Sequence, residues 1–194
     1  MTLPTKLSVL RILLTFLIVG LLFLPGWLAK SVALASFLLA GLTDWLDGYL
    51  ARRWRQTSPM GALLDPIADK VLVLGTLLAL VPLALIPAWM VLVIALRELL
   101  ITGVRLFATS RGIILSAAKE GKHKTVSQMA TIMVILAVLI VRELPGRAWA
   151  SGPRAVAIDW VMLGCLWVTV ILTVGSGAAF FWRHRTVLLA GGRP

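Results

Sequence analysis

Four aspartates at helical spacing are the residues of this sequence best suited to chemistry. Asp44 and Asp47 are three positions apart and Asp65 and Asp69 are four apart, so each pair shares one face of a helix if its segment is helical. The segment from 44 to 69 contains no His or Cys, and a set of oxygen ligands suits a hard divalent cation such as Mg²⁺, Mn²⁺ or Ca²⁺. Four carboxylates are enough for two ions about 4 Å apart, the arrangement used for displacement at phosphorus.

Small and basic residues accompany these carboxylates. Gly48 and Ala51 lie four and seven positions after the first aspartate, on the same helix face, and leave space there for a substrate. Arg52 follows at once and is able to neutralise a phosphate. Ser58 and Pro59 are residue types favoured at the N-cap and the first position of a helix. The pattern predicts two helices with a substrate site where they face each other.

The composition excludes an ordinary soluble domain. Hydrophobic residues make up 60% of the 194 residues and charged residues 14%, against about 45–50% and about 25% in a typical globular domain. The single cysteine, Cys165, excludes a disulfide scaffold and a zinc cluster built on thiolates. We therefore predict an all-α integral membrane protein with one domain over residues 1–194.

Six segments are long and apolar enough to cross a membrane, which takes roughly 20 residues of helix. They are Leu7–Leu24, Ser31–Leu50, Leu63–Leu85, Trp89–Thr109, Val126–Val141 and Ala155–Phe181. The second, third and fourth segments carry charges and are therefore the weaker candidates by hydropathy. Together they predict a bundle of six transmembrane helices.

The distribution of the basic residues predicts the orientation of the bundle. With the N-terminus in the cytoplasm, 13 of the 19 Lys and Arg residues lie on the cytoplasmic side, and Lys70 and Arg97 lie within spans. The remaining four are Lys30, Arg142, Arg147 and Arg154. The positive-inside rule therefore places both termini in the cytoplasm. Since membrane topology accounts for most of the net charge of +11, we expect no nucleic-acid partner.

The predicted topology brings the four aspartates together. The second and third spans are joined by the short loop 52–58 and must run antiparallel, with all four carboxylates at the cytoplasmic end. A charge at bilayer depth costs at least about 2.5–3.5 kcal/mol, so such a cluster needs compensation. Bound cations provide it. Salt bridges to Lys70 or Arg97 are the structural alternative, and a cation- or proton-coupled transporter is an alternative from another class.

The same residues resemble the signature of the CDP-alcohol phosphatidyltransferase family, D-x2-D-G-x2-A-R-x8-G-x3-D-x3-D. All eight fixed positions match, namely Asp44, Asp47, Gly48, Ala51, Arg52, Gly61, Asp65 and Asp69. The resemblance implies a metal-dependent phosphotransferase with a six-helix membrane fold, usually a homodimer, whose site opens to the cytoplasm. It implies that Asp44, Asp47 and Asp65 hold two Mg²⁺ or Mn²⁺ ions. Asp69 would be both a metal ligand and the general base.

Further segments resemble the branch of this family that uses glycerol 3-phosphate as acceptor. Residues 3–11 are similar to its short amphipathic N-terminal segment, and residues 65–70, 97–105 and 121–128 also look like that branch. The implied reaction moves a phosphatidyl group from CDP-diacylglycerol to glycerol 3-phosphate, giving phosphatidylglycerol phosphate and CMP in phospholipid biosynthesis at the bacterial inner membrane. The residues implied to contact the CDP part of the donor are Pro4, Thr5, Gly48, Arg52 and Ser58.

An acceptor that is a dianion needs fixed cations beside the donor's pyrophosphate. Four basic residues of the fourth span and the following cytoplasmic segment lie on the same predicted side as the aspartates. They are Arg97, Arg105, Lys122 and Lys124. Such a cluster argues against serine as the acceptor, whereas inositol phosphate and phosphatidylglycerol stay open as alternatives.

Other polar residues receive structural predictions. Adjacent residues point about 100° apart on a helix, so we predict that Glu98 pairs with a residue other than Arg97. His123 and His184 are predicted to lie in loops, and Asp159 is assigned no function.

Overall fold

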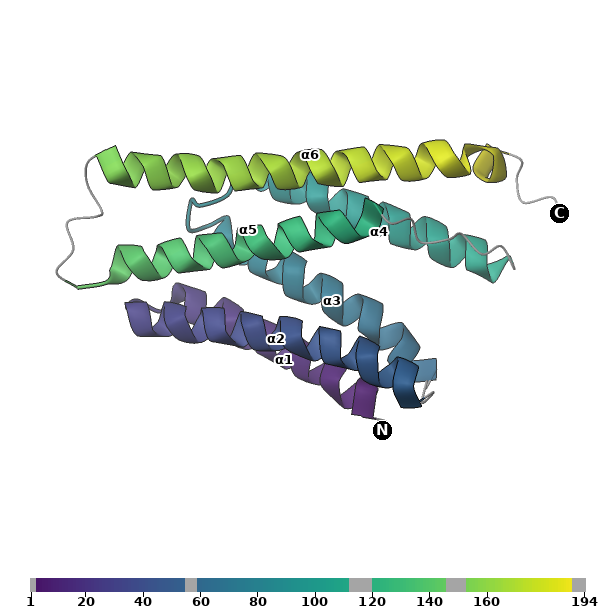
Figure 1. Cartoon of the computed structure of the whole chain (residues 1–194), viewed down its shortest axis with the longest axis horizontal. Helices are drawn as coiled ribbons and strands as arrows, with labels where there is room; N and C mark the ends of the chain where they lie inside the picture. Colours follow the sequence, from purple (N-terminus) through teal and green to yellow (C-terminus); the bar gives the residue numbers. More distant parts are fainter. Residues whose placement is uncertain (1–2, 55–58, 112–119, 146–152, 190–194) are drawn as a thin grey trace.

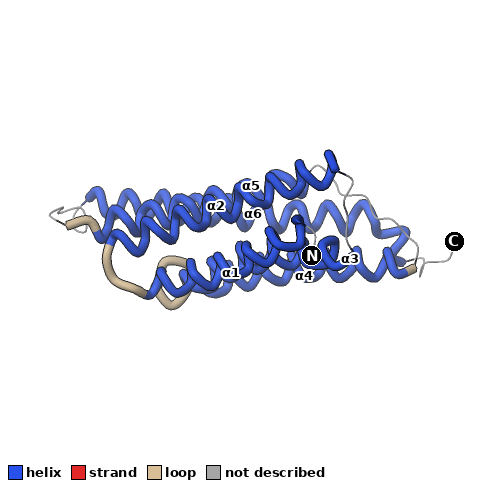
Figure 2. The backbone as a smooth tube through the Cα atoms, turned by 90° about the horizontal axis from the view of Figure 1, so that it is seen from below, coloured by secondary structure: helices blue, strands red, loops and turns tan. Residues whose placement is uncertain are grey.

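The computed structural model describes residues 3–54, 59–111, 120–145 and 153–189, which form six α-helices (Figure 1). They are α1 (Leu3–Phe23), α2 (Trp27–Trp54), α3 (Pro59–Leu80), α4 (Ala88–Ser110), α5 (Glu120–Glu143) and α6 (Pro153–Leu189). The helices run back and forth along one long axis, as Figure 2 also shows, so the start of α1 and the end of α6 lie at the same end of the bundle. No strand occurs in the described ranges, and the all-α prediction is confirmed.

Each predicted span corresponds to one helix, with differences at the ends. α1 begins at Leu3, so the predicted amphipathic segment is continuous with the first span. α3 begins at Pro59, the residue predicted for its first position. α2, α4, α5 and α6 extend past the predicted spans at both ends, whereas α1 ends one residue early and α3 ends at Leu80, before the predicted Leu85. The early end of α3 follows from Pro82, because the residue before a proline is disfavoured in a helix.

Four of the six helices are long and apolar enough to cross a membrane. These stretches are Thr5–Phe23, Trp27–Asp44, Lys124–Glu143 and Pro153–Arg185. α3 and α4 have similar lengths, but each carries three ionisable residues, namely Asp65, Asp69 and Lys70 in α3 and Arg97, Glu98 and Arg105 in α4. The composition therefore supports an all-α membrane protein with four clearly apolar helices. These two charged helices carry two of the signature aspartates and two of the predicted acceptor cations.

Large apolar side chains remain exposed on the outside of the bundle. Phe16 of α1 is 70% exposed, and Trp160 and Trp182 of α6 are 67% and 72% exposed. Extensive apolar surface of this kind is rare on soluble monomers. It is the surface expected of helices that face lipid.

All six helices contribute to the core of the bundle. α1 packs on α2 and α3, while α5 packs on α2 and α6, and α4 contacts α3 and α6. Ile18, Phe37, Leu72, Ile94 and Ile135 are almost fully buried in this core. α4 is thus placed between the signature helix α3 and the C-terminal helix α6.

Lys30 joins three helices at the end opposite the start of α1. Gly26 adopts a positive φ of 101° in the turn between α1 and α2, a conformation that glycine adopts without strain. Beyond it, Lys30 Nζ donates to the carbonyl oxygens of Leu22 (2.7 Å) and Leu24 (2.6 Å) at the end of α1. Its ammonium also lies 3.3 Å from Glu143 Oε1 of α5. This contact joins Lys30, which the charge pattern predicts on the outer side, to the residue that follows Arg142, another predicted outer residue.

Candidate active site

The signature aspartates lie on two helices that contact each other. Asp44 and Asp47 are in the C-terminal half of α2, and Asp65 and Asp69 are in the N-terminal half of α3. Both segments are helical, so the predicted spacing of three and four residues does place each pair on one helix face. Asp44 and Asp69 are close enough to interact electrostatically. The side chains of Asp47 and Asp65 lie outside the described residues.

α1 holds the first of these carboxylates. Arg11 Nη1 lies 2.9 Å from Asp44 Oδ1, and the Arg11 side chain is fully buried while that of Asp44 is 43% exposed. The guanidinium therefore lies inside the bundle, whereas the carboxylate that it contacts is partly exposed. The sequence indicates no role for Arg11, because no spacing rule relates it to Asp44 on another helix.

The donor set of the signature fits a hard divalent cation. It consists of carboxylates alone, and Asp44 is partly exposed and so accessible to an ion. Among the described side chains, no three acidic, His or Cys groups lie close enough together to hold a metal. That set leaves out two of the four signature carboxylates. The residues of the signature therefore fit a divalent cation by their chemistry.

Asp69 faces the interior of the bundle. It borders a cavity of about 10 Å³ together with Lys70, Glu98, Lys124 and Gln128. These residues come from α3, α4 and α5, so the cavity connects the signature carboxylates with the predicted cation cluster. Its volume is close to that of a single water position.

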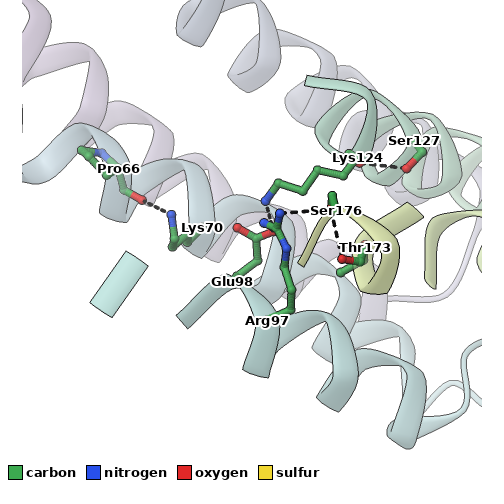
Figure 3. Close-up of polar contacts among 8 residues, drawn as sticks. All are labelled: Pro66, Lys70, Arg97, Glu98, Lys124, Ser127, Thr173 and Ser176. Carbon is green, nitrogen blue, oxygen red and sulfur yellow. Dashed lines mark hydrogen bonds and ion pairs between the residues drawn. The ribbon is translucent and has the colours of Figure 1, made fainter. Parts of the chain in front are cut away.

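A buried ion-pair cluster lies beside this cavity (Figure 3). Lys124 forms an ion pair with Glu98, and Arg97 Nη1 lies 3.1 Å from the same carboxylate oxygen. The Arg97 Nη2 group donates to Ser176 Oγ of α6 at 3.0 Å. Glu98 therefore does pair with a residue other than Arg97, as predicted, but it also pairs with Arg97, which the prediction left out. The long arginine side chain bends back over its neighbour although the two Cα–Cβ bonds diverge.

The structure describes the side chains of only some of the other predicted site residues. Arg105 is half-buried on α4 and has no ion-pair partner among the described residues. Thr5 is buried on α1. Several predicted contacts lie in helices but have side chains outside the described set, namely Pro4, Gly48, Arg52 and Lys122. Ser58 lies outside the described residues altogether.

An apolar groove of about 500 Å³ runs between α3 and α4. Ile67, Leu74 and Leu78 line it on α3, Leu99 lines it on α4, and Lys70 also contributes to the lining. Lys70 Nζ also approaches the carbonyl oxygen of Pro66 at 3.5 Å (Figure 3). The groove provides apolar surface directly beside the residues that carry charge.

The predicted positions of two histidines are wrong. His123 lies in α5 and His184 in α6, because both helices extend further than the apolar spans. His184 is buried, with Nδ1 3.0 Å from the carbonyl oxygen of Phe180. Asp159, which received no function, forms an ion pair with Arg142.

The fold and the site define the class as an all-α membrane protein that carries a carboxylate signature next to buried cations. The chain belongs to the CDP-alcohol phosphatidyltransferase family, whose model matches residues 1–175. It is 38% identical to the CDP-diacylglycerol–glycerol-3-phosphate 3-phosphatidyltransferase of Bacillus subtilis over 148 residues, 76% of this chain and 70% of that protein. It is 32% identical to the enzyme of the same name from Cereibacter sphaeroides over 208 residues, 93% and 94% of the two chains. A cardiolipin synthase (CMP-forming) of Oryza sativa is 36% identical over 186 residues, 88% of this chain and 56% of that one.

Proposed function

We propose that this chain transfers the phosphatidyl group of CDP-diacylglycerol to glycerol 3-phosphate, which yields phosphatidylglycerol phosphate and CMP. One arrangement carries the proposal: the Asp69 carboxylate and the Glu98–Lys124 ion pair border the same small cavity. The reaction needs carboxylates beside the donor's pyrophosphate and cations beside a dianionic acceptor. The names of the Bacillus and Cereibacter relatives agree with this substrate pair.

The bond changes define what the residues have to do. The 1-hydroxyl oxygen of glycerol 3-phosphate attacks the phosphorus that carries the diacylglycerol, and the bond from that phosphorus to CMP breaks. CMP leaves with the bridging oxygen. Asp69 accepts the hydroxyl proton, directly or through one water, as the general base. This is a direct displacement and needs no covalent intermediate on the protein.

The carboxylates of Asp44, Asp47, Asp65 and Asp69 are the proposed ligands for two divalent ions. Bound Mg²⁺ or Mn²⁺ would neutralise the pyrophosphate and polarise the attacked phosphorus. The ion pair with Arg11 orients the Asp44 carboxylate for this role.

The substrates bind through the remaining predicted residues. The acceptor phosphate contacts Arg97, Arg105, Lys122 and Lys124, and the CDP part of the donor contacts Pro4, Thr5, Gly48, Arg52 and Ser58. Arg105 supports the first assignment, because it is a half-buried cation without an ion-pair partner in the described part of the chain. The groove between α3 and α4 supports a lipid donor, since acyl chains need apolar surface next to the polar site.

We further propose six membrane crossings, with the site facing the cytoplasm and the chain forming a homodimer in the bacterial inner membrane. The contact of Lys30 with Glu143 supports the topology, because it joins two predicted outer ends. The basic residues near the opposite end support the orientation.

A parallel acceptor assay tests the proposed function. The full-length protein, purified in detergent micelles that contain CDP-diacylglycerol, is given glycerol 3-phosphate, inositol phosphate, serine or phosphatidylglycerol, and CMP release is measured. Among the four acceptors, we expect only glycerol 3-phosphate to give rapid CMP release. EDTA should abolish this release, and Mg²⁺ or Mn²⁺ should restore it. Fastest release with phosphatidylglycerol would instead favour the activity named for the Oryza relative. Release that is indifferent to EDTA would contradict the metal assignment.

A further inference from the structure

The C-terminal helix contributes a side chain to the cation cluster. Ser176 of α6 accepts a hydrogen bond from Arg97 Nη2 at 3.0 Å, across 79 positions of sequence. The Ser176 hydroxyl itself donates to the carbonyl oxygen of Thr173 at 3.0 Å (Figure 3). The serine proton is therefore directed along α6, and the oxygen lone pairs are directed to the guanidinium. This arrangement fixes Ser176 as an acceptor for Arg97.

The next residue allows α6 to approach that arginine. A Cβ placed on Gly177 would lie 3.2 Å from Arg97 Cγ and 3.7 Å from its Nε. The first distance is tighter than ordinary van der Waals contact between carbons. Gly175, two positions earlier on the same helix, has open space around its corresponding position. Of these two glycines, only Gly177 is packed against the guanidinium stem.

The two contacts of Arg97 define the orientation of its planar group. One Nη group reaches Glu98 and the other reaches Ser176, so the fork is held at both ends. Each Nη group carries two N–H donors, which leaves one N–H on each for a further acceptor. A guanidinium oriented in this way presents paired donors to a phosphate, the geometry in which arginine binds oxyanions most strongly.

We propose that Ser176 and Gly177 are positioning residues that orient the Arg97 guanidinium toward the phosphate of the acceptor. This inference rests on the proposed function, because it takes the acceptor phosphate as the ligand of Arg97. Both residues lie beyond residue 175, where the match to the family model ends, so the family match assigns them no role. The C-terminal helix then contributes to acceptor recognition as well as to the membrane anchor.

Steady-state kinetics of the full-length protein test the inference. We expect Ser176→Ala to raise the KM for glycerol 3-phosphate about tenfold, since it removes one hydrogen bond that orients a charged group. The KM for CDP-diacylglycerol stays within about twofold. Ser176→Thr retains the oxygen and restores most of the acceptor affinity. Gly177→Ala raises the acceptor KM, whereas Gly175→Ala, the matched control, leaves both constants unchanged.

Arg97→Met separates failure of the inference from failure of the proposed function. In the Arg97→Met background, Ser176→Ala is expected to have no further effect on the acceptor KM. If Arg97→Met raises the acceptor KM and Ser176→Ala alone does not, the inference is overturned while the function stands. Equal changes in the two KM values for Ser176→Ala, with a lowered unfolding temperature, indicate a purely structural contact and also overturn it. Failure of the proposed function appears in the unmodified protein, as CMP release that does not depend on glycerol 3-phosphate.

Discussion

Two lysine–glutamate pairs in this bundle have a buried lysine, and they are arranged differently. The Lys30 ammonium has two backbone carbonyls and the Glu143 carboxylate as acceptors, which matches its three N–H donors. The Glu98 carboxylate, in contrast, is shared between Lys124 and Arg97. The first cluster is balanced in charge, and the second has one positive charge in excess.

This difference separates a structural contact from a candidate binding site. An unbalanced charge inside an apolar helix bundle costs about 2.5–3.5 kcal/mol on insertion scales. A protein tolerates this cost where a bound ligand of opposite charge balances the excess, as a phosphate would at Arg97 and Lys124. Arg105 lies close enough to Arg97 to interact with it electrostatically, and it adds a further positive charge to this region. The balanced cluster at Lys30 needs no ligand.

The largest effect is expected from the carboxylate beside the unbalanced cluster. Asp69→Asn keeps the size of the side chain but removes its ability to accept a proton at neutral pH. Turnover in the CMP-release assay should fall about 10³-fold, while binding of the CDP-diacylglycerol donor is largely retained. Normal turnover in this variant would refute the general-base role of Asp69.

A smaller effect is expected from the cation that lacks an ion-pair partner in the described part of the chain. Arg105→Ala should raise the KM for glycerol 3-phosphate on the order of tenfold to a hundredfold, as expected for hydrogen bonds to a charged group. The KM for the donor should change little. Arg111→Ala is the matched control, since Arg111 is exposed at the end of the same helix and stacks on Phe107. Equal changes in both KM values would show that Arg105 is assigned to the wrong substrate.

The balanced cluster should affect stability and leave substrate binding unchanged. Lys30→Met removes a buried ammonium and leaves Glu143 without its cation, which we expect to cost about 2 kcal/mol of the free energy of unfolding. Thermal unfolding in detergent micelles measures this loss. Lys6→Met, at an exposed position of α1, provides the comparison for unfolding. An altered acceptor KM in Lys30→Met would contradict the division between the two clusters.

The sequence predicts the helices better than the contacts between them. Apolar runs, and the preference of Pro59 for a first helical position, are local properties, and the helices follow them. Ser176 could not be predicted as a partner of Arg97, because the contact depends on how α6 packs against α4. The sequence predicts a partner for Glu98 other than Arg97, which is Lys124, but it misses the additional contact with Arg97. A helical angle describes Cα–Cβ directions and not the reach of a flexible arginine.

The carboxylate signature is an intermediate case. Its spacing predicts that Asp44 and Asp47 share one helix face and that Asp65 and Asp69 share another, and the helical backbone agrees. It does not predict that Arg11 of α1 would be buried against Asp44, because that contact joins distant positions. Residue type and register are thus available from the sequence, whereas the counter-charges require the folded arrangement.

The smallest effect is expected at the exposed ion pair between Arg142 and Asp159. These side chains are 34% and 54% exposed, and exposed pairs contribute little because water screens both charges. Asp159→Asn should therefore change the free energy of unfolding by less than about 0.5 kcal/mol and leave CMP release unchanged. It is the same chemical substitution as Asp69→Asn, so the two variants together compare a carboxylate at the proposed site with one in a solvated pair. A loss of activity in Asp159→Asn would mean that charge at this end of the bundle also influences the reaction, and the separation between the two regions would then fail.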